Sequence, residues 1–383
     1  MKILMLAWRD MKHPKMGGAE IVTDVYLKGL SKLGYKVTLF TARYENSKEQ
    51  ENFNGYEIIR KGKGIGAHFK GLIYAKKNED YFDIIIDQIN TLPFFTPLAI
   101  KKEKRVVFFH QLCKNIWFYE SKFPVSLIGY LAESSYLKFY KNTRAFVVSE
   151  STKKDLIKYC WMNPNNILFL ENQINFKPIK KPKEKENYFV FVGRLTKSKR
   201  VEDCIKALSQ IKNKSTKLYI IGDGYDKYKN YLKKLTNNLD LNKQIIFTGK
   251  INNKERNKLI QKATAILVTS VKEGWGLIVT EANANGTVAI TYNADGLRDA
   301  NKTGFITKEN NPEELARLMN FFLGDKNLLR EKSEDSLRFA REHCDWDNNT
   351  WRLEEWITTK NLNKQIYPFV MDKNSHFYPL RAK

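Results

Sequence analysis

Two glutamates bracket a short glycine-containing loop in the second half of the chain, within the stretch Lys272-Glu273-Gly274-Trp275-Gly276-Leu277-Ile278-Val279-Thr280-Glu281-Ala282. An apolar run over residues 263–269 precedes the loop and predicts a buried parallel strand, and the apolar segment after it predicts a helix from about Gly276. Such a corner points free backbone N–H groups and the positive end of the helix dipole at one place, which suits a phosphate or diphosphate.

The two carboxylates of this corner predict a second kind of contact. Glu273 precedes the loop, and Glu281 is expected about two turns into the helix. Because carboxylates repel phosphate, we expect each to bind hydroxyl groups, one of a sugar and one of a ribose. Gly274 and Gly276 lack side chains that would hold a ligand away from the backbone. The spacing alone also occurs on solvated helix faces, so the hypothesis depends on the whole stretch.

Cations follow the first strand of the second half. The strand expected over residues 188–192 leads through Gly193 to Arg194 and Lys199, and then to a helix from about residue 201. At such a corner the guanidinium can bind a diphosphate through two parallel hydrogen bonds, and the ammonium can bind it as a single positive charge. Further on, Gly222 and Gly249 end two more expected strands, where a ligand can approach the backbone closely.

The first half offers a glycine pair and a histidine. Gly17 and Gly18 lie between a predicted strand and a helix expected over residues 21–33, and they fit either a tight turn or a place where substrate meets a helix N-terminus. His110 ends the strand 105–110. A histidine there is often structural, but the carboxyl ends of strands in an open α/β sheet are where ligands bind.

Strand and helix signals alternate along the first half as in a doubly wound α/β domain. The expected strands cover residues 3–7, 37–41, 56–60, 83–89, 105–110, 145–149 and 167–170. A basic stretch with two prolines, 177–186, interrupts the pattern and predicts an interdomain linker.

Composition limits the class of protein. At 383 residues two domains are expected, and neither a membrane-spanning run nor a signal peptide stands out, which places the chain in the cytoplasm. Four scattered cysteines indicate neither a metal site nor a disulfide framework. A formal charge of +24 and a pI near 9.6 imply an anionic partner, although lysine-rich composition alone is the alternative.

Residues 117–131 are dense in aromatic and aliphatic side chains and are flanked by lysines. One interpretation is a cleft-lining loop followed by a core helix. The other is a segment on a membrane surface, with aromatic rings at the headgroup level and lysines on anionic lipid.

The sequence E-G-W-G-L-x-x-x-E after a buried strand, and G-R-L-x-x-x-K after another, closely resemble the motifs of retaining glycosyltransferase family 4, the glycosyl transferases of group 1. The resemblance covers roughly residues 1–360. It implies an α/β GT-B fold, with two Rossmann-like doubly wound domains facing a central cleft. The implied organisation is an acceptor-binding domain at 1–176, a linker at 177–186, a nucleotide-sugar-binding domain at 187–345, and helices crossing back with a tail at 346–383.

The resemblance also implies the roles of the site residues. The catalytic set is His110, Arg194, Lys199 and Glu273. Acceptor binding is implied for Gly17, Gly18 and His110. Donor binding is implied for Gly18, Gly193, Arg194, Lys199, Gly222, Gly249, Glu273, Gly274, Trp275, Gly276, Leu277, Ile278 and Glu281. No metal is expected, because two cations and a helix end can stabilise the leaving diphosphate.

The implied reaction is retaining transfer of a hexose of the mannose or glucose type from a UDP- or GDP-sugar, with no other cofactor. The expected acceptor is a glycan or a lipid-linked glycan at the cytoplasmic membrane face, with peripheral contact to anionic lipid. Two alternatives stay open. One is a sugar-phosphate-accepting synthase of the same fold, and the other is a basic nucleic-acid-binding protein, which leaves the glutamate motif unexplained.

Overall fold

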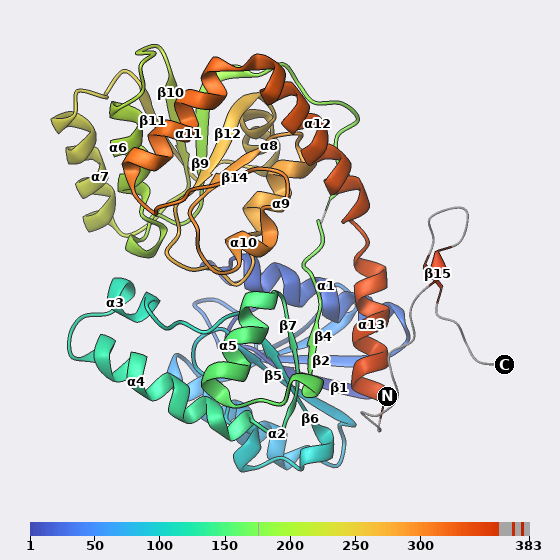
Figure 1. Cartoon of the computed structure of the whole chain (residues 1–383). Coiled ribbons are helices and arrows are strands. Elements are labelled where there is room, and N and C mark those ends of the chain that lie inside the picture. The colour runs from blue at the N-terminus through green and yellow to red at the C-terminus, as the bar shows by residue number, and fades with distance from the viewer. Residues whose placement is uncertain (175, 360–369, 372–376, 379–383) are drawn as a thin grey trace.

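A computed structural model of the chain describes residues 1–174, 176–359, 370–371 and 377–378. Two layered α/β halves lie one above the other, with the carboxyl ends of their strands facing each other (Figure 1). This is the GT-B architecture expected from the sequence.

The first half is built on an eight-stranded sheet of order β3-β4-β2-β1-β5-β6-β7-β8. Its strands are β1 (Lys2–Leu6), β2 (Lys36–Thr41), β3 (Gln50–Phe53), β4 (Tyr56–Arg60), β5 (Ile84–Ile89), β6 (Arg105–Phe109), β7 (Arg144–Val147) and β8 (Ile167–Phe169). Its helices are α1 (Gly18–Lys32), α2 (Ile65–Lys77), α3 (Ile116–Glu120), α4 (Val125–Leu137) and α5 (Glu150–Cys160), with short 3-10 turns η1 (Thr96–Leu98), η2 (Lys102–Lys104), η3 (Lys138–Tyr140) and η4 (Pro164–Asn166).

Alternating side chains of buried strands hold helices on both faces of this sheet. In β1, Ile3 and Met5 pack with α1, whereas Leu4 and Leu6 pack with α2 on the other face. All strand pairs are parallel except β3, which runs antiparallel to β4. The strand β3 was not predicted, because its sequence Gln-Glu-Asn-Phe is polar.

The second half is built on a six-stranded parallel sheet of order β11-β10-β9-β12-β13-β14. Its strands are β9 (Glu186–Val192), β10 (Lys217–Ile221), β11 (Ile245–Gly249), β12 (Ala263–Val268), β13 (Ala289–Thr291) and β14 (Phe305–Ile306). Its helical elements are η5 (Lys197–Lys199), α6 (Val201–Ser209), α7 (Asp226–Asn238), α8 (Asn253–Lys262), α9 (Leu277–Ala284), α10 (Leu297–Ala300), α11 (Pro312–Gly324) and α12 (Lys326–Glu342).

Both sheets reverse their strand order at one place, between β1 and β5 in the first and between β9 and β12 in the second. In open α/β sheets a ligand binds at the carboxyl ends of the strands beside such a reversal. The loop after β1 ends at Gly17, directly before Gly18 of α1. The loop after β9 carries Arg194, and the loop after β12 carries Glu273. The topology therefore brings the predicted corners to the facing edges of the two sheets.

The last long helix, α13 (Trp346–Thr358), returns from the second half and packs on α1 of the first (Figure 1). Arg144 at the start of β7 donates to the main-chain oxygens of Trp356 and Thr359 at 2.8 and 2.7 Å. Trp346 and Trp356 are buried, whereas Trp351 is exposed, so two of the three tryptophans of this helix serve its packing. Beyond α13, a short antiparallel pair joins β15 (Val370–Met371) and β16 (Phe377–Tyr378), and the rest of the predicted tail lies outside the described residues.

The interpretation of residues 117–131 as ending in a core helix is wrong. Helix α4 leaves Ile128 and Leu131 62% and 60% exposed, and Phe123 before it is 79% exposed. Its apolar side chains run nearly all round the helix, so the sequence pattern did not distinguish an inward face from an outward one. Among the described residues, no helix is both long enough and apolar enough to cross a bilayer.

Candidate active site

The donor corner predicted from the sequence is a strand, a loop and a helix. Strand β12 ends at Val268, and α9 begins at Leu277 after Gly276, whose φ of 100° lies in the left-handed region that favours glycine. Glu281 is the fifth residue of α9, so it lies little more than one turn into the helix rather than the expected two.

Glu273 and Lys199, which were expected to contact different parts of a ligand, form an ion pair with each other. Ser270 donates to the same carboxylate oxygen of Glu273 at 2.7 Å. Both charged side chains are about one-fifth exposed, so a ligand can reach the pair. A bound diphosphate would compete with Glu273 for Lys199, and the freed carboxylate could then turn to sugar hydroxyls.

Glu281 is paired with Arg256 of α8, whose Nη2 lies 3.2 Å from a carboxylate oxygen. Burial raises the pKa of Glu281, while the charge of Arg256 opposes that change. No sequence motif pointed to Arg256, because the two residues come from different helices.

The three glycines Gly193, Gly222 and Gly249 lie side by side at the ends of β9, β10 and β11. The N–H of Gly222 donates to the oxygen of Gly249 at 3.0 Å, and a Cβ on Gly222 would overlap the oxygen of Gly193. Close packing of the main chains thus explains why position 222 is a glycine, without any contact to a ligand. The neighbouring Asp223 is a turn residue, since it accepts from the N–H of Gly224 at 2.8 Å.

The corners of the two halves touch each other. A Cβ on Gly18, the first residue of α1, would lie 3.0 Å from Leu277 Cδ1, the first residue of α9. A Cβ on Gly274 would overlap the main-chain oxygen of His110. The N-termini of α1 and α9 therefore face the same region, and both direct positive dipole ends toward it.

Because Gly274 and His110 come from different halves of the molecule, Gly274→Ala tests whether the two halves must approach this closely for reaction. The substitution is expected to lower the turnover rate about 10²-fold, because a methyl group must push the carbonyl of His110 and the reacting groups apart by about 1 Å. The control is Gly66→Ala, since a Cβ there meets nothing within 4 Å. The rate is measured as release of nucleoside diphosphate from a nucleotide sugar, the donor that the resemblance implies. An unchanged rate in Gly274→Ala would contradict the closed arrangement as the reactive one.

His110 is buried and neutral. Its Nε2 lies 2.7 Å from the side-chain nitrogen of Gln88, which also contacts Thr23. Because the amide nitrogen can only donate, Nε2 accepts and the proton is assigned to Nδ1. Burial lowers the pKa of His110 to about 3. The ring can therefore offer an N–H to a ligand, but it is not suited to carry a proton away near neutral pH.

The low pKa of His110 has a consequence for stability. Between its usual value of 6.5 and the folded value of about 3, the unfolded chain binds the proton and the folded chain does not. His110 therefore destabilises the fold progressively as pH falls through this window, by up to about 1.4 kcal/mol per pH unit. Urea unfolding of wild type and His110→Gln between pH 7 and 4 measures the difference. We expect the free energy of unfolding to fall less steeply with decreasing pH in His110→Gln than in wild type. Equal pH dependence in the two proteins would contradict the low pKa of His110.

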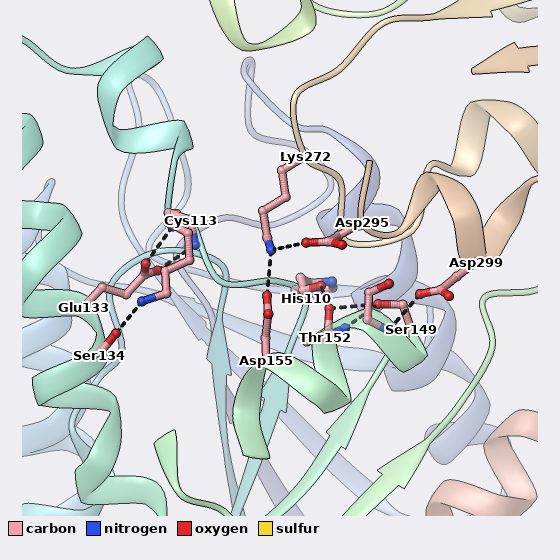
Figure 2. A network of polar contacts seen from close by, with 12 residues as sticks. His110, Cys113, Glu133, Ser134, Ser149, Thr152, Asp155, Lys272, Asp295 and Asp299 are labelled. Atoms are coloured by element: carbon pink, nitrogen blue, oxygen red, sulfur yellow. Dashed lines mark hydrogen bonds and ion pairs between the residues drawn. The ribbon is translucent and has the colours of Figure 1, made fainter. Parts of the chain in front are cut away.

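The structure adds charged residues that sequence reasoning missed. Lys272, next to Glu273, bridges Asp155 of α5 and Asp295 of the loop after β13 (Figure 2). Asp299 of α10 accepts from the N–H of Ser151 at 2.8 Å. Arg9 follows β1, and its pKa is lowered by burial and by the charge of Arg194, with Glu20 acting in the opposite direction. Lys272 stands at the start of the glutamate stretch, but the sequence did not indicate its partners, because only the facing sheets bring Asp155 and Asp295 to it.

The chain matches known families over most of its length. Residues 16–176 match the description Glycosyltransferase Family 4, and residues 172–340 match Glycosyl transferases group 1. The two matches adjoin where the first sheet gives way to the second. The chain belongs to this family of glycosyltransferases, which take their sugar from a nucleotide-sugar donor.

Individual proteins are similar at lower identity. An uncharacterized glycosyltransferase of Methanocaldococcus jannaschii is 25% identical over 385 residues, covering 91% of this chain and 95% of that protein. Sucrose-phosphate synthase from Thermosynechococcus elongatus has a TM-score of 0.76 at 17% identity, over 92% of this chain and 97% of that one. WaaG, a glycosyltransferase involved in lipopolysaccharide biosynthesis, has a TM-score of 0.73 at 17% identity, over 93% of this chain and 99% of that one. At these identities the two structures support the GT-B fold.

Proposed function

We propose that this protein is a retaining, metal-independent hexosyltransferase. In this proposal residues 187–345 bind the UDP- or GDP-sugar, residues 1–176 bind the acceptor, and 177–186 link them. The observation that carries the proposal is the pairing of Lys199 with Glu273 at the N-terminus of α9, directly opposite the corner of Gly18 and His110. One side of this site suits a diphosphate and the other suits hydroxyl groups.

The negative charge that grows on the leaving diphosphate is met by the side chains of Arg194 and Lys199 and by the N–H groups at Leu277 and Ile278. Interactions that strengthen as this charge develops accelerate the chemical step. Glu273, released from Lys199, accepts hydrogen bonds from the sugar hydroxyls. Glu281 gives up its ion pair with Arg256 and accepts hydrogen bonds from the ribose hydroxyls instead. His110 donates its Nδ1 proton in a hydrogen bond near the sugar and remains neutral throughout.

Retention is the stereochemical part of the proposal. Incubation with a nucleotide sugar and an accepted substrate, followed by NMR of the product, tests it. We expect the anomeric configuration of the donor in the product. The opposite configuration would contradict this mechanism.

An anionic acceptor is supported by Arg9. Its guanidinium and that of Arg194 come from different halves of the molecule and repel each other. The nearby carboxylate of Glu20, which also accepts from the N–H of Gly17 at 2.6 Å, attracts Arg9 more strongly than Arg194 repels it. A phosphate or carboxylate on the incoming acceptor would relieve this repulsion, and would enter past Gly17, Gly18 and His110.

A membrane location of the acceptor is supported by the surface of α3 and α4, which we call the apolar surface. It consists of Phe118, Tyr119, Phe123, Val125, Leu127, Ile128 and Leu131, all exposed. Lys122 lies within it, and Lys114 and Lys138 lie beside it. Apolar side chains and lysines together fit the interface of an anionic bilayer, so we propose peripheral attachment at the cytoplasmic face.

Sedimentation with vesicles of phosphatidylglycerol and phosphatidylcholine tests this attachment. Wild type is expected to sediment with the anionic vesicles at low salt, and the double variant Ile128→Ser/Leu131→Ser is expected to stay in solution. Phe321→Ser is the control, because Phe321 is exposed on α11 of the other half. Equal sedimentation of all three proteins, or none at all, would count against the apolar surface as the attachment site.

The nearest alternative is a synthase that transfers the sugar to a sugar phosphate. The likeness to sucrose-phosphate synthase favours it, and Arg9 suits a phosphorylated sugar as well as a lipid-linked phosphate. Adding glucose or fructose phosphates to the assay distinguishes the two, because only the synthase would turn over without lipid. The nucleic-acid alternative would require a gel shift with a steep salt dependence.

A further inference from the structure

Lys272 connects the two halves of the molecule through an ion pair. Its Nζ lies 2.6 Å from Asp155 Oδ2 of the first half and 3.0 Å from Asp295 Oδ2 of the second. Figure 2 shows the side chain reaching down from the second half, between the two carboxylates. Only 10% of the Lys272 side chain is exposed. An ammonium this far removed from water is retained where charged partners surround it.

The pairing with Asp295 belongs to the donor loop itself. The main-chain oxygen of Asp295 accepts from the N–H of Glu273 at 3.1 Å. At the next residue, Gly296, a Cβ would overlap the main-chain oxygen of Glu273. The side chain of Lys272 and the main chain of Glu273 are thus both fixed to the loop after β13, and this arrangement does not depend on the other half.

The pairing with Asp155 depends on closure. Asp155 lies on α5, whose N-terminus meets α10 through Ser151 and Asp299. A further bridge joins Glu120 of α3 to the N–H of Ser198 at 3.1 Å. Of these three bridges only the one at Lys272 places charges of opposite sign on the two halves, so it attracts them over the longest distance.

We propose that Lys272 is a positioning residue, which Asp155 engages on closure so that the adjacent Glu273 is set in place for sugar transfer. This inference rests on the proposed function. When the two halves are apart, the ion pair of Lys272 and Asp295 is in contact with water. The carboxylate of Asp155 then has no ion-pair partner and is solvated by water. Closure excludes water from all three groups and fixes the loop from both sides.

Small-angle X-ray scattering and steady-state kinetics of Asp155→Asn and Lys272→Met test the proposal. Both variants are expected to have a larger radius of gyration than wild type and to turn over about tenfold more slowly. The dissociation constant for UDP or GDP, whichever the wild type binds, is expected to stay within about twofold, because the nucleotide contacts the second half. Lys272→Arg, which keeps the charge, is expected to recover most of the rate.

The control is Lys262→Met, since Lys262 pairs with Glu186 at 2.8 Å on the surface of the second half alone. The double variant Asp155→Asn/Lys272→Met is expected to be no slower than either single variant, since the two residues act as one pair. Additive losses, or a radius of gyration unchanged in both single variants, would overturn the proposal. Scattering needs no substrate, so a failure of the bridge is distinguishable from a failure of the proposed reaction.

Discussion

Replacing Lys199 by methionine is expected to lower the rate of nucleoside diphosphate release about 10²- to 10³-fold, which is the usual effect of removing one donor from a site of developing charge. The loss should fall mainly on kcat, because the charge on the diphosphate grows as the sugar leaves. Methionine keeps the length and most of the volume of lysine, so the half-buried stem of the side chain stays packed.

Lys206→Met is the matched control for this substitution. Lys206 is exposed on α6 of the same half, and its replacement removes the same charge from the protein. If Lys199→Met were no slower than Lys206→Met, general positive charge rather than a positioned cation would account for binding of the diphosphate.

Replacing Glu273 by alanine is the second substitution with a large expected effect. Two hydrogen bonds from sugar hydroxyls to a carboxylate, each worth about 2 kcal/mol, correspond to a loss of about 10³-fold in kcat/KM. The ion pair with Lys199 disappears as well, but this leaves the ammonium free for the diphosphate. Binding of the nucleotide alone should therefore be kept or strengthened, while the contribution of the sugar is lost.

Unchanged binding of the nucleotide, together with loss of the affinity that the sugar adds, distinguishes a sugar-binding carboxylate from a structural one. Glu331→Ala serves as the control, because Glu331 is exposed on α12. Weaker binding of the nucleotide and of the nucleotide sugar by the same factor in Glu273→Ala would mean that the carboxylate supports the loop rather than the sugar.

The fold was largely predictable because buried parallel strands are rich in apolar residues, as in Ile84–Ile86 of β5 and in most of β12. The hairpin of β3 and β4 was missed although Asn54-Gly55, both with positive φ, is a strong hairpin signal. Apolar periodicity does not reveal this hairpin, because β3 has only one apolar residue.

The candidate site was predictable where its residues lie in one corner of one half. The order strand, loop and helix placed Gly276 directly before α9 and Glu273 in the loop ahead of it, as the structure has them. Partners from other elements were not predictable, because the contacts of Lys272 with Asp155 and of His110 with Gly274 depend on how the two sheets face each other. For α4 the sequence left a core helix and a membrane-surface segment both open, because composition alone does not show what covers a helix.

The donor site is tested by calorimetric titration of UDP, GDP and their glucose and mannose conjugates into wild type, Lys199→Ala and Glu273→Ala. We expect wild type to bind one nucleotide series and to bind its sugar conjugate more tightly. Lys199→Ala should weaken binding of the whole series, and Glu273→Ala should lose only the gain from the sugar. If wild type binds none of these ligands, the site between β9, β12 and α9 is not a nucleotide-sugar site.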